Sequence, residues 1–235
     1  MKALRLKLYQ ETACYKKPHA LKVSETYPLP PFATVKGMLH AVMGATSLID
    51  MKLCIQGTHT GMINDYQTYY FFKSDTTPEF ALTAAGLPGV KGEFNQITTM
   101  PIYRHLLYHV QLVIFVQAEE TVLEQICESI LASSAFISLG RHEDLVRVDG
   151  CDIVELEETD SCELTHSAFV PLPIASESDI YGMPYKLNWV YRIVKGVRVW
   201  DKIAVSFAEK DQTIVETEEF PLYIDDENHA VFFHH

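Results

Sequence analysis

The side chains best suited to chemistry in this sequence are cationic and aromatic groups rather than catalytic clusters. Tyr103, Arg104 and His105 form an aromatic–cation–imidazole trio, and such side chains stack on unpaired bases. Gly140 and Arg141 follow Ser-Leu and precede His-Glu-Asp. A glycine there lets the backbone approach a phosphate, and a guanidinium can bind the phosphate through two hydrogen bonds. Both patterns indicate RNA binding.

A second group of basic residues lies nearer the N-terminus. Lys36 and Gly37 fall in the first turn of a predicted helix, where unpaired N–H groups favour a phosphate. Lys22 precedes the proline run that leads into this helix. Arg5 and Lys7 alternate with leucines, so we expect them to face outward from a half-buried strand.

Other chemistries have little support. His105 and His109 are spaced H-x-x-x-H in a predicted strand with no carboxylate beside them, unlike a zinc-binding H-E-x-x-H helix. The sequence contains no G-x-S-x-G elbow, phosphate-binding loop or dinucleotide fingerprint. Its five cysteines are scattered without a C-x-x-C pair. We therefore expect no metal ion, no cofactor and no catalytic residue.

Charge is distributed unevenly along the chain. The 235 residues carry a formal net charge of −12, of which residues 1–150 contribute −1 (13 basic, 14 acidic) and residues 151–235 contribute −11 (6 basic, 17 acidic). Residues 1–60 alone carry +5 (8 basic, 3 acidic). Because salt screens charges beyond about 8 Å, a local basic surface matters more to a polyanion than the total. We expect the acidic C-terminal region to face away from RNA.

The longest strongly apolar stretch, residues 110–118, is much shorter than the about 20 residues of a bilayer helix. No apolar leader follows the N-terminus. These features, with the scattered cysteines, predict a cytoplasmic protein without a membrane partner.

The spacing of apolar residues predicts the elements that position these groups. Strands are expected at residues 3–9, 62–72, 98–118 and 145–148, and helices at residues 32–44 and 121–133, the second capped by Thr121. This order predicts an α+β fold of ferredoxin-like plan over residues 1–150. A β-rich acidic region without helices is expected over residues 151–235.

Three segments carry a resemblance to a known family. They are Pro30-Pro31-Phe32-Ala33-Thr34-Val35-Lys36-Gly37-Met38-Leu39, Pro101-Ile102-Tyr103-Arg104-His105-Leu106-Leu107-Tyr108, and Phe136-Ile137-Ser138-Leu139-Gly140-Arg141-His142-Glu143-Asp144-Leu145. With the opening strand, they resemble the Cas-five family of CRISPR-associated RAMP proteins, and most closely its type I-B branch. The resemblance covers the first 150 residues.

This resemblance implies a ferredoxin-like, RRM-related N-terminal domain with an inserted thumb at about residues 73–99. It implies a subunit that caps one end of the Cascade surveillance complex and binds the 5′ handle of the crRNA. The expected protein partners are the backbone subunit and the large subunit, and target DNA is met only through the complex. The expected RNA-binding residues are Lys22, Lys36, Gly37, Tyr103, Arg104, His105, Gly140 and Arg141.

Two other functions remain open. The type I-C branch of the family cuts precursor crRNA with a metal-independent Tyr/Lys/His group. The nearest grouping here is Tyr103, Arg104 and His105, and arginine is too basic to act as a general base. One alternative is therefore a metal-independent endoribonuclease that processes repeat RNA. The other is a purely structural protein whose aromatic strands contact other proteins.

Overall fold

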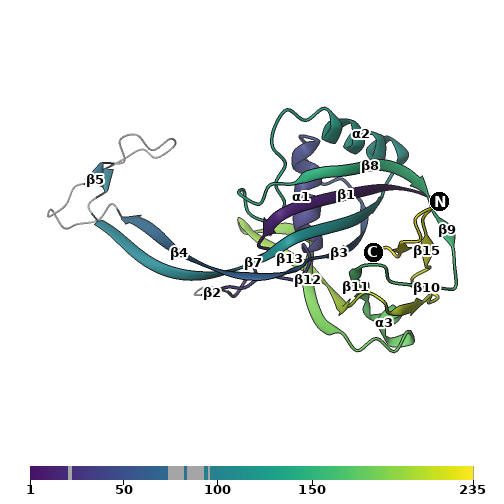
Figure 1. The fold of residues 1–235 in the computed structure, drawn as a ribbon. Coiled ribbons are helices and arrows are strands. Elements are labelled where there is room, and N and C mark those ends of the chain that lie inside the picture. The colour runs from purple at the N-terminus through teal and green to yellow at the C-terminus, as the bar shows by residue number, and fades with distance from the viewer. Residues whose placement is uncertain (21–22, 74–81, 84–92, 95, 235) are drawn as a thin grey trace.

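The computed structural model describes residues 1–20, 23–73, 82–83, 93–94 and 96–234, with side chains described outside residues 71–98 (Figure 1). Its body is built on one large, mainly antiparallel sheet with the strand order β12-β13-β11-β3-β7-β1-β8. Helices α1 and α2 cover one face, and the C-terminal segments cover the other. The sheet is therefore the middle layer of three.

One end of this sheet has four strands in the order β8-β1-β7-β3. They are β1 (Lys2–Ala13), β3 (Lys52–Thr58), β7 (Gln96–Gln117) and β8 (Arg147–Glu155). Helix α1 (Phe32–Val42) connects β1 to β3, and α2 (Glu120–Leu131) connects β7 to β8. Each helix joins two parallel strands that have a third, antiparallel strand between them.

Apolar periodicity explains β1 and α1. Leu4, Leu6 and Leu8 lie in the core between the sheet and the helices, as the alternation predicts. The predicted strand at residues 3–9 and the predicted helix at residues 32–44 are both confirmed. The helix ends two residues earlier than predicted and begins after Pro31 without a side-chain cap.

Strand β3 is missing from the sequence prediction. Leu53, Cys54, Ile55 and Gln56 are all buried because β3 is covered on both faces. Such a strand does not show the alternation that marks a half-buried one. Two further details were predicted wrongly. Helix α2 begins at Glu120 after Glu119, so Thr121 is not its N-cap, and β8 lies at Arg147–Glu155 rather than at 145–148.

A two-stranded ribbon extends from the body (Figure 1). It consists of β4 (Gly61–Lys73) and the first half of β7, paired from Gly61 opposite Tyr108 to Lys73 opposite Gln96. The predicted strands at residues 62–72 and 98–118 are confirmed. The predicted thumb at about residues 73–99 lies largely outside the described residues. Within it, β5 (Leu82–Thr83) pairs with β6 (Glu93–Phe94).

The C-terminal region adds strands to the same sheet. Strand β11 (Ser167–Pro171) pairs with β3 and with β13 (Val197–Ala208), which pairs with β12 (Met183–Val194). A short helix that was not predicted, α3 (Leu172–Glu177), follows β11. The remaining short strands are β2 (Val23–Ser24), β9 (Glu157–Glu158), β10 (Ser161–Glu163), β14 (Thr213–Val215), β15 (Tyr223–Ile224) and β16 (Ala230–Val231). Among the described helices, none is long and apolar enough to cross a membrane.

The C-terminal segments also cover the second face of the sheet, where Arg5 and Lys7 lie. Arg5 is 6% exposed, and its Nη1 lies 2.7 Å from Asp225 Oδ2 and 2.5 Å from Asp226 Oδ1. Lys7 Nζ lies 2.5 Å from Glu227. The expectation that both cations face outward is therefore wrong for Arg5, whereas the Lys7 side chain is 33% exposed and paired at the surface. Alternation separates an apolar face from a polar one, but it does not tell whether water or carboxylates meet the polar face.

The buried ion pair makes a prediction about stability. Burial alone would raise the pKa of Asp225, but hydrogen bonds from His229 and Arg5 outweigh it and hold the pKa well below its ordinary value. Asp225→Asn should lower the free energy of unfolding at pH 7 by about 3–5 kcal/mol, because it removes the one buried carboxylate of the Arg5 ion pair and leaves only partners that are 69% and 42% exposed, Asp226 and Glu227. Because the pKa in the folded protein is far below the ordinary value, this stabilisation is complete above about pH 4 and is lost only as the pH falls towards the folded-state pKa. The difference between wild type and Asp225→Asn should therefore narrow only in strong acid.

The matched control is Asp226→Asn, which removes the other carboxylate bonded to Arg5. The Asp226 side chain is 69% exposed, so its loss should lower stability by less than about 1 kcal/mol. Urea unfolding at pH 7 and at about pH 2 measures both effects. Equal losses for the two variants would contradict the assignment.

Candidate nucleic-acid interface

One face of the ribbon carries a row of exposed aromatic side chains. Tyr103 on β7 lies directly opposite Tyr66 on β4, with ring centres 5.3 Å apart in an edge contact. Tyr70 lies four residues further along β4 and therefore on the same face. These three tyrosines, which we call the tyrosine row, are each more than half exposed. His105 shares this face of β7 and is half-buried.

Arg104 lies on the opposite face because side chains alternate along a strand. It is 4% exposed, and its Nη1 donates a hydrogen bond to Glu143 Oε1 at 2.9 Å. Its guanidinium carbon also lies 5.3 Å from the ring centre of Tyr69. Arg104 is thus anchored within the protein, and stacking it on a base would require it to leave these partners.

Gly140 and Arg141 belong to a loop organised by Asp144. Arg141 binds this carboxylate through Nε at 3.0–3.1 Å and Nη2 at 2.5 Å. The Arg141 and Cys14 backbone N–H groups also donate to Asp144 Oδ2, at 2.9 and 3.0 Å. Gly140 has φ of +109°, and a Cβ there would lie 2.8 Å from Asp144 Oδ2. The loop therefore requires glycine at this position.

Glu143 joins the two arginines. Its Oε1 accepts a hydrogen bond from Arg104 Nη1 and another from Arg141 Nη1, the latter at 2.6 Å. Burial alone would raise the pKa of Glu143, but its own backbone N–H and the cations Arg141, His142 and Arg104 together lower it. The structure thus brings Arg104, Arg141 and Gly140 together, as an ion-paired network rather than as an open cationic cleft.

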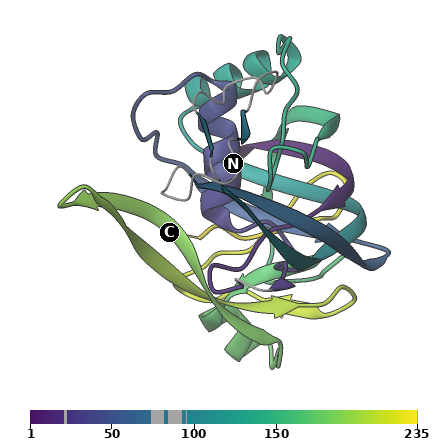
Figure 2. The same cartoon turned by 90° about the vertical axis from the view of Figure 1, so that its left-hand side faces the viewer.

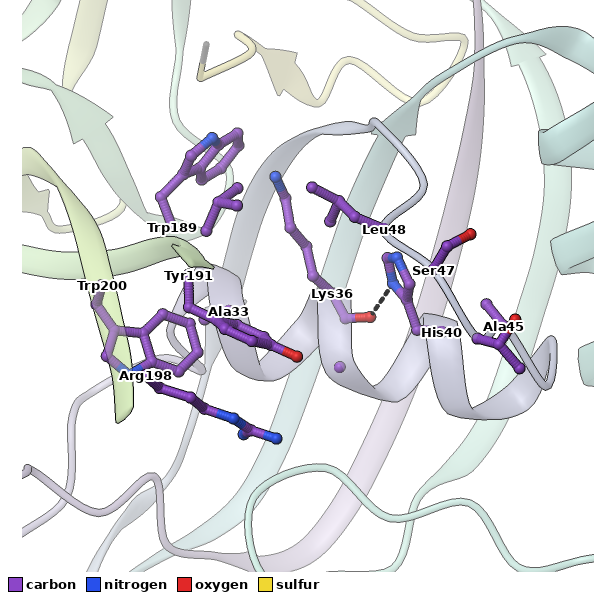
Figure 3. Close-up of a pocket in the computed structure, with 13 residues that line it drawn as sticks. Ala33, Lys36, His40, Ala45, Ser47, Leu48, Trp189, Tyr191, Arg198 and Trp200 are labelled. Atoms are coloured by element: carbon purple, nitrogen blue, oxygen red, sulfur yellow. Dashed lines mark hydrogen bonds between the residues drawn. The ribbon is translucent and has the colours of Figure 1, made fainter. Parts of the chain in front are cut away.

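Lys36 and Gly37 lie elsewhere, on the side of α1 that faces β12 and β13. Lys36 is 5% exposed, and its Nζ lies 3.3 Å from the ring centre of Trp189 (Figure 3). Burial lowers the pKa of Lys36 to about 8. Gly37 is exposed, and nothing lies within 4 Å of a Cβ built on it. Both residues line a pocket of about 500 Å³.

His40, one turn after Lys36, has both ring nitrogens engaged. Nδ1 lies 2.7 Å from the Lys36 carbonyl oxygen, and Nε2 accepts the Ile49 N–H at 2.9 Å. These bonds require the neutral ring with its proton on Nδ1. His40 therefore holds the loop after α1 against the helix, with both ring nitrogens hydrogen-bonded.

The far wall of the pocket consists of residues that the sequence analysis did not select: Trp189, Tyr191, Arg198 and Trp200 from the β12–β13 hairpin (Figures 2 and 3). Five of the six basic residues of positions 151–235 lie in this hairpin, with one acidic residue. Three aromatic and three basic residues occur within twelve positions of its sequence, Trp-Val-Tyr-Arg-Ile-Val-Lys-Gly-Val-Arg-Val-Trp. The net charge of residues 151–235 is strongly negative, so it concealed the local group of basic and aromatic residues in this hairpin.

A smaller hollow continues from this pocket along the start of α1 and shares Ala33 and Trp200 with it. Its other residues include Lys16, Tyr27 and Asn188. Lys22 lies outside the described residues. Among the residues whose side chains are described, no three His, Cys, Asp or Glu are grouped so that they could hold a metal ion.

The fold is similar to those of solved CRISPR proteins. One is a chain of a structure described as "CRISPR RNA-guided surveillance complex", with a TM-score of 0.56 and 15% identity over 90% of this chain and 91% of that one. Another is a CRISPR protein from Archaeoglobus fulgidus, with a TM-score of 0.50 and 13% identity over the full length of both. At these identities the likeness shows a shared fold.

Sequence comparison identifies the family. Residues 3–213 match the family model described as CRISPR-associated protein (Cas_Cas5). The chain therefore belongs to this family, as the resemblance of its three segments implies. Comparison with curated proteins gives no significant match. Assignment to the type I-B branch stays a prediction.

The two glycines of the candidate interface should respond oppositely to alanine. Gly140→Ala should lower the free energy of unfolding by about 1–3 kcal/mol, because φ is positive and the new methyl group meets Asp144. Gly37→Ala should raise it by up to about 1 kcal/mol, because alanine stabilises a helix interior and the site is open. Denaturant unfolding of both variants measures the difference. If both variants lost stability equally, the conformational argument at Gly140 would fail.

Proposed function

We propose that this protein is the subunit of a CRISPR effector complex that binds the 5′ handle of the crRNA. In this proposal it contacts the backbone subunit and the large subunit, and it meets target DNA only through the assembled complex. The tyrosine row is the observation that carries the proposal. Exposed aromatic faces on a protruding ribbon suit the unstacked bases of a single-stranded RNA end.

The strand order β8-β1-β7-β3, with its two helical crossovers, supports a ferredoxin-like, RRM-related plan. RRM domains bind RNA on the open face of their sheet. Here both faces are covered, and Val113 and Phe115 of β7 are buried beneath C-terminal residues. RNA bases must therefore bind outside the body of the sheet, and the ribbon supplies the exposed aromatic residues.

The candidate residues take different roles in this proposal. Tyr103 and His105 contact bases directly. Arg104, Gly140 and Arg141 fix the loop against β7 beneath the ribbon, because their charges and backbone conformation are committed to Glu143 and Asp144. Lys36 and Gly37 belong to a separate contact along α1. The prediction that Lys22 contacts the RNA rests on the sequence alone.

The tyrosine row leads to a prediction about the affinity for RNA. Tyr103→Leu should weaken binding of a single-stranded RNA carrying the repeat-derived 5′ handle by about tenfold, since a stacked base contributes about 1–3 kcal/mol. The salt dependence of binding should not change, because no phosphate contact is removed. Fluorescence anisotropy at several salt concentrations measures both quantities.

Tyr181→Leu is the matched control. Tyr181 is 93% exposed and lies between α3 and β12, away from the ribbon. Its loss should leave handle affinity unchanged. Equal affinities for wild type, Tyr103→Leu and Tyr181→Leu would count against the row as the base-binding surface.

We further propose that the chain does not cut RNA. Tyr103 and His105 share one face of β7, but the cation between them points to the other face and is ion-paired. Lys36, whose pKa of about 8 would suit proton transfer, neighbours an imidazole with both nitrogens already hydrogen-bonded. Neither place offers a free acid and base side by side.

This predicts that CRISPR repeat RNA stays intact during long incubation with the purified chain in EDTA. Gel electrophoresis of end-labelled RNA measures cleavage. Cleavage that survives EDTA and disappears in His105→Ala would instead establish the metal-independent endoribonuclease.

A further inference from the structure

The pocket between α1 and the β12–β13 hairpin contains cations without anionic partners. Arg5, Arg104 and Arg141 each have a carboxylate oxygen within 2.9 Å. Among the described residues, by contrast, neither Lys36 nor Arg198 forms an ion pair. Lys36 is 5% exposed, and the ring of Trp189 is its close contact. Asp50 attracts the ammonium without forming an ion pair with it, and burial still lowers the pKa of Lys36. The contact with the aromatic ring therefore leaves part of the lost hydration uncompensated.

The walls of the pocket are aromatic. Trp189, Tyr191 and Trp200 line one side, and the Arg198 guanidinium carbon lies 4.6 Å from the ring centre of Tyr191 (Figure 3). The Tyr191 and Trp200 ring centres are 5.2 Å apart. No acidic residue is among those that line it. The pocket thus has a cation on each wall, Lys36 on α1 and Arg198 on β13, beside flat apolar surfaces. The Lys36 ammonium points to Trp189 and the Arg198 guanidinium points away from it (Figure 3), so an anion shared by the two requires the exposed Arg198 side chain to turn inward.

We propose that this pocket binds a single nucleotide of the RNA, with its phosphate between Lys36 and Arg198 and its base against the tryptophans. The inference rests on the proposed function and adds a second, separate contact to it. A phosphate matches the pair of cations because a guanidinium bonds it through two N–H groups while an ammonium supplies a point charge. A base matches the tryptophans because every base has a flat face to stack.

An acidic peptide of a partner protein is the competing occupant. A carboxylate would compensate the same cations, but it brings no ring to the aromatic walls. The volume of about 500 Å³ is within the range of small-molecule sites and accommodates one nucleotide. The nucleotide uses both features of the pocket, so we argue for it and leave the peptide as an outcome of the test.

The chain contains its own probe for this site. It has two tryptophans, Trp189 and Trp200, and both line the pocket. Titrating the full chain with nucleoside 5′-monophosphates should therefore change its tryptophan fluorescence in a saturable way. The corresponding nucleosides and inorganic phosphate should each bind at least about tenfold more weakly, since each lacks one of the two contacts.

Lys36→Met removes the charge while keeping a long apolar side chain, and it should weaken monophosphate binding about tenfold or more. Arg198→Gln should act in the same direction, and it alters an exposed residue whose loss does not threaten folding. Lys202→Met is the control, because Lys202 is an exposed lysine of β13 that does not line the pocket. It should leave the affinity unchanged.

The pH dependence provides an independent readout. Lys36 binds phosphate while protonated, and its pKa in the free protein is about 8. Affinity should fall as pH rises from 7 to 9.5, a range in which the phosphate stays dianionic, and Lys36→Met should lack this fall. The other ionisable or charged groups around Lys36 are His40, Asp50, Tyr191 and Arg198.

Several results would overturn the inference. Nucleosides that bind as tightly as monophosphates, or Lys36→Met and Arg198→Gln variants with wild-type affinity, would exclude the phosphate contact. Inorganic phosphate that binds as tightly as a nucleotide would exclude the base contact. A glutamate-rich peptide that binds more tightly than the monophosphates would assign the pocket to a protein partner.

The two proposals can fail separately. If monophosphates do not bind but handle RNA does, with the loss expected for Tyr103→Leu, the nucleotide pocket is wrong and the proposed function stands. If monophosphates bind but handle RNA does not, the pocket stands as a nucleotide site and the proposed function is wrong.

Discussion

Burial of the central sheet on both faces is the constraint on which the rest of this structure depends. The α1–α2 layer covers one face with a leucine-rich core, and the C-terminal segments cover the other. Covering the second face buries Arg5, so the same segments must supply Asp225 and its neighbours as counter-charges. Because no open sheet face remains in the described body, the proposed RNA contacts lie on the protruding ribbon and in the pocket between α1 and the β12–β13 hairpin.

Cations that bind carboxylates of the chain itself are structural, whereas cations without such a partner are available to a ligand. Arg5, Arg104, Arg141 and Lys7 all bind carboxylates of the chain itself, and a phosphate would have to displace those carboxylates to reach them. Lys36 is buried without such a partner. In a chain with 31 acidic residues, a desolvated lysine left unpaired is the stronger indication of an anion site.

The alternation of apolar and polar residues predicts only those strands that have one buried face and one exposed face. Alternation located β1 and the ribbon, since those strands have distinct faces. It could not locate β3, where four successive residues are buried. The Arg5 side chain was predicted on the correct face of its strand but in the wrong environment, because a counter-charge 220 residues away in sequence leaves no local signal. Tyr103 was selected as a candidate by its residue type. Trp189 and Trp200 were not selected, because the acidic average of residues 151–235 hid the basic hairpin in which they lie.

The strong negative charge of the whole chain is compatible with binding an RNA end, and it favours selectivity for one. A net charge of −12 repels polyanions at long range, so duplexes and bulk RNA gain little from diffuse attraction. A ligand that offers unstacked bases to the tyrosine row and one phosphate to Lys36 and Arg198 gains short-range contacts that salt screens weakly. Under this proposal, the surface discriminates by base stacking and by local fit rather than by total charge, which suits the proposed role of holding one end of one RNA among many other nucleic acids.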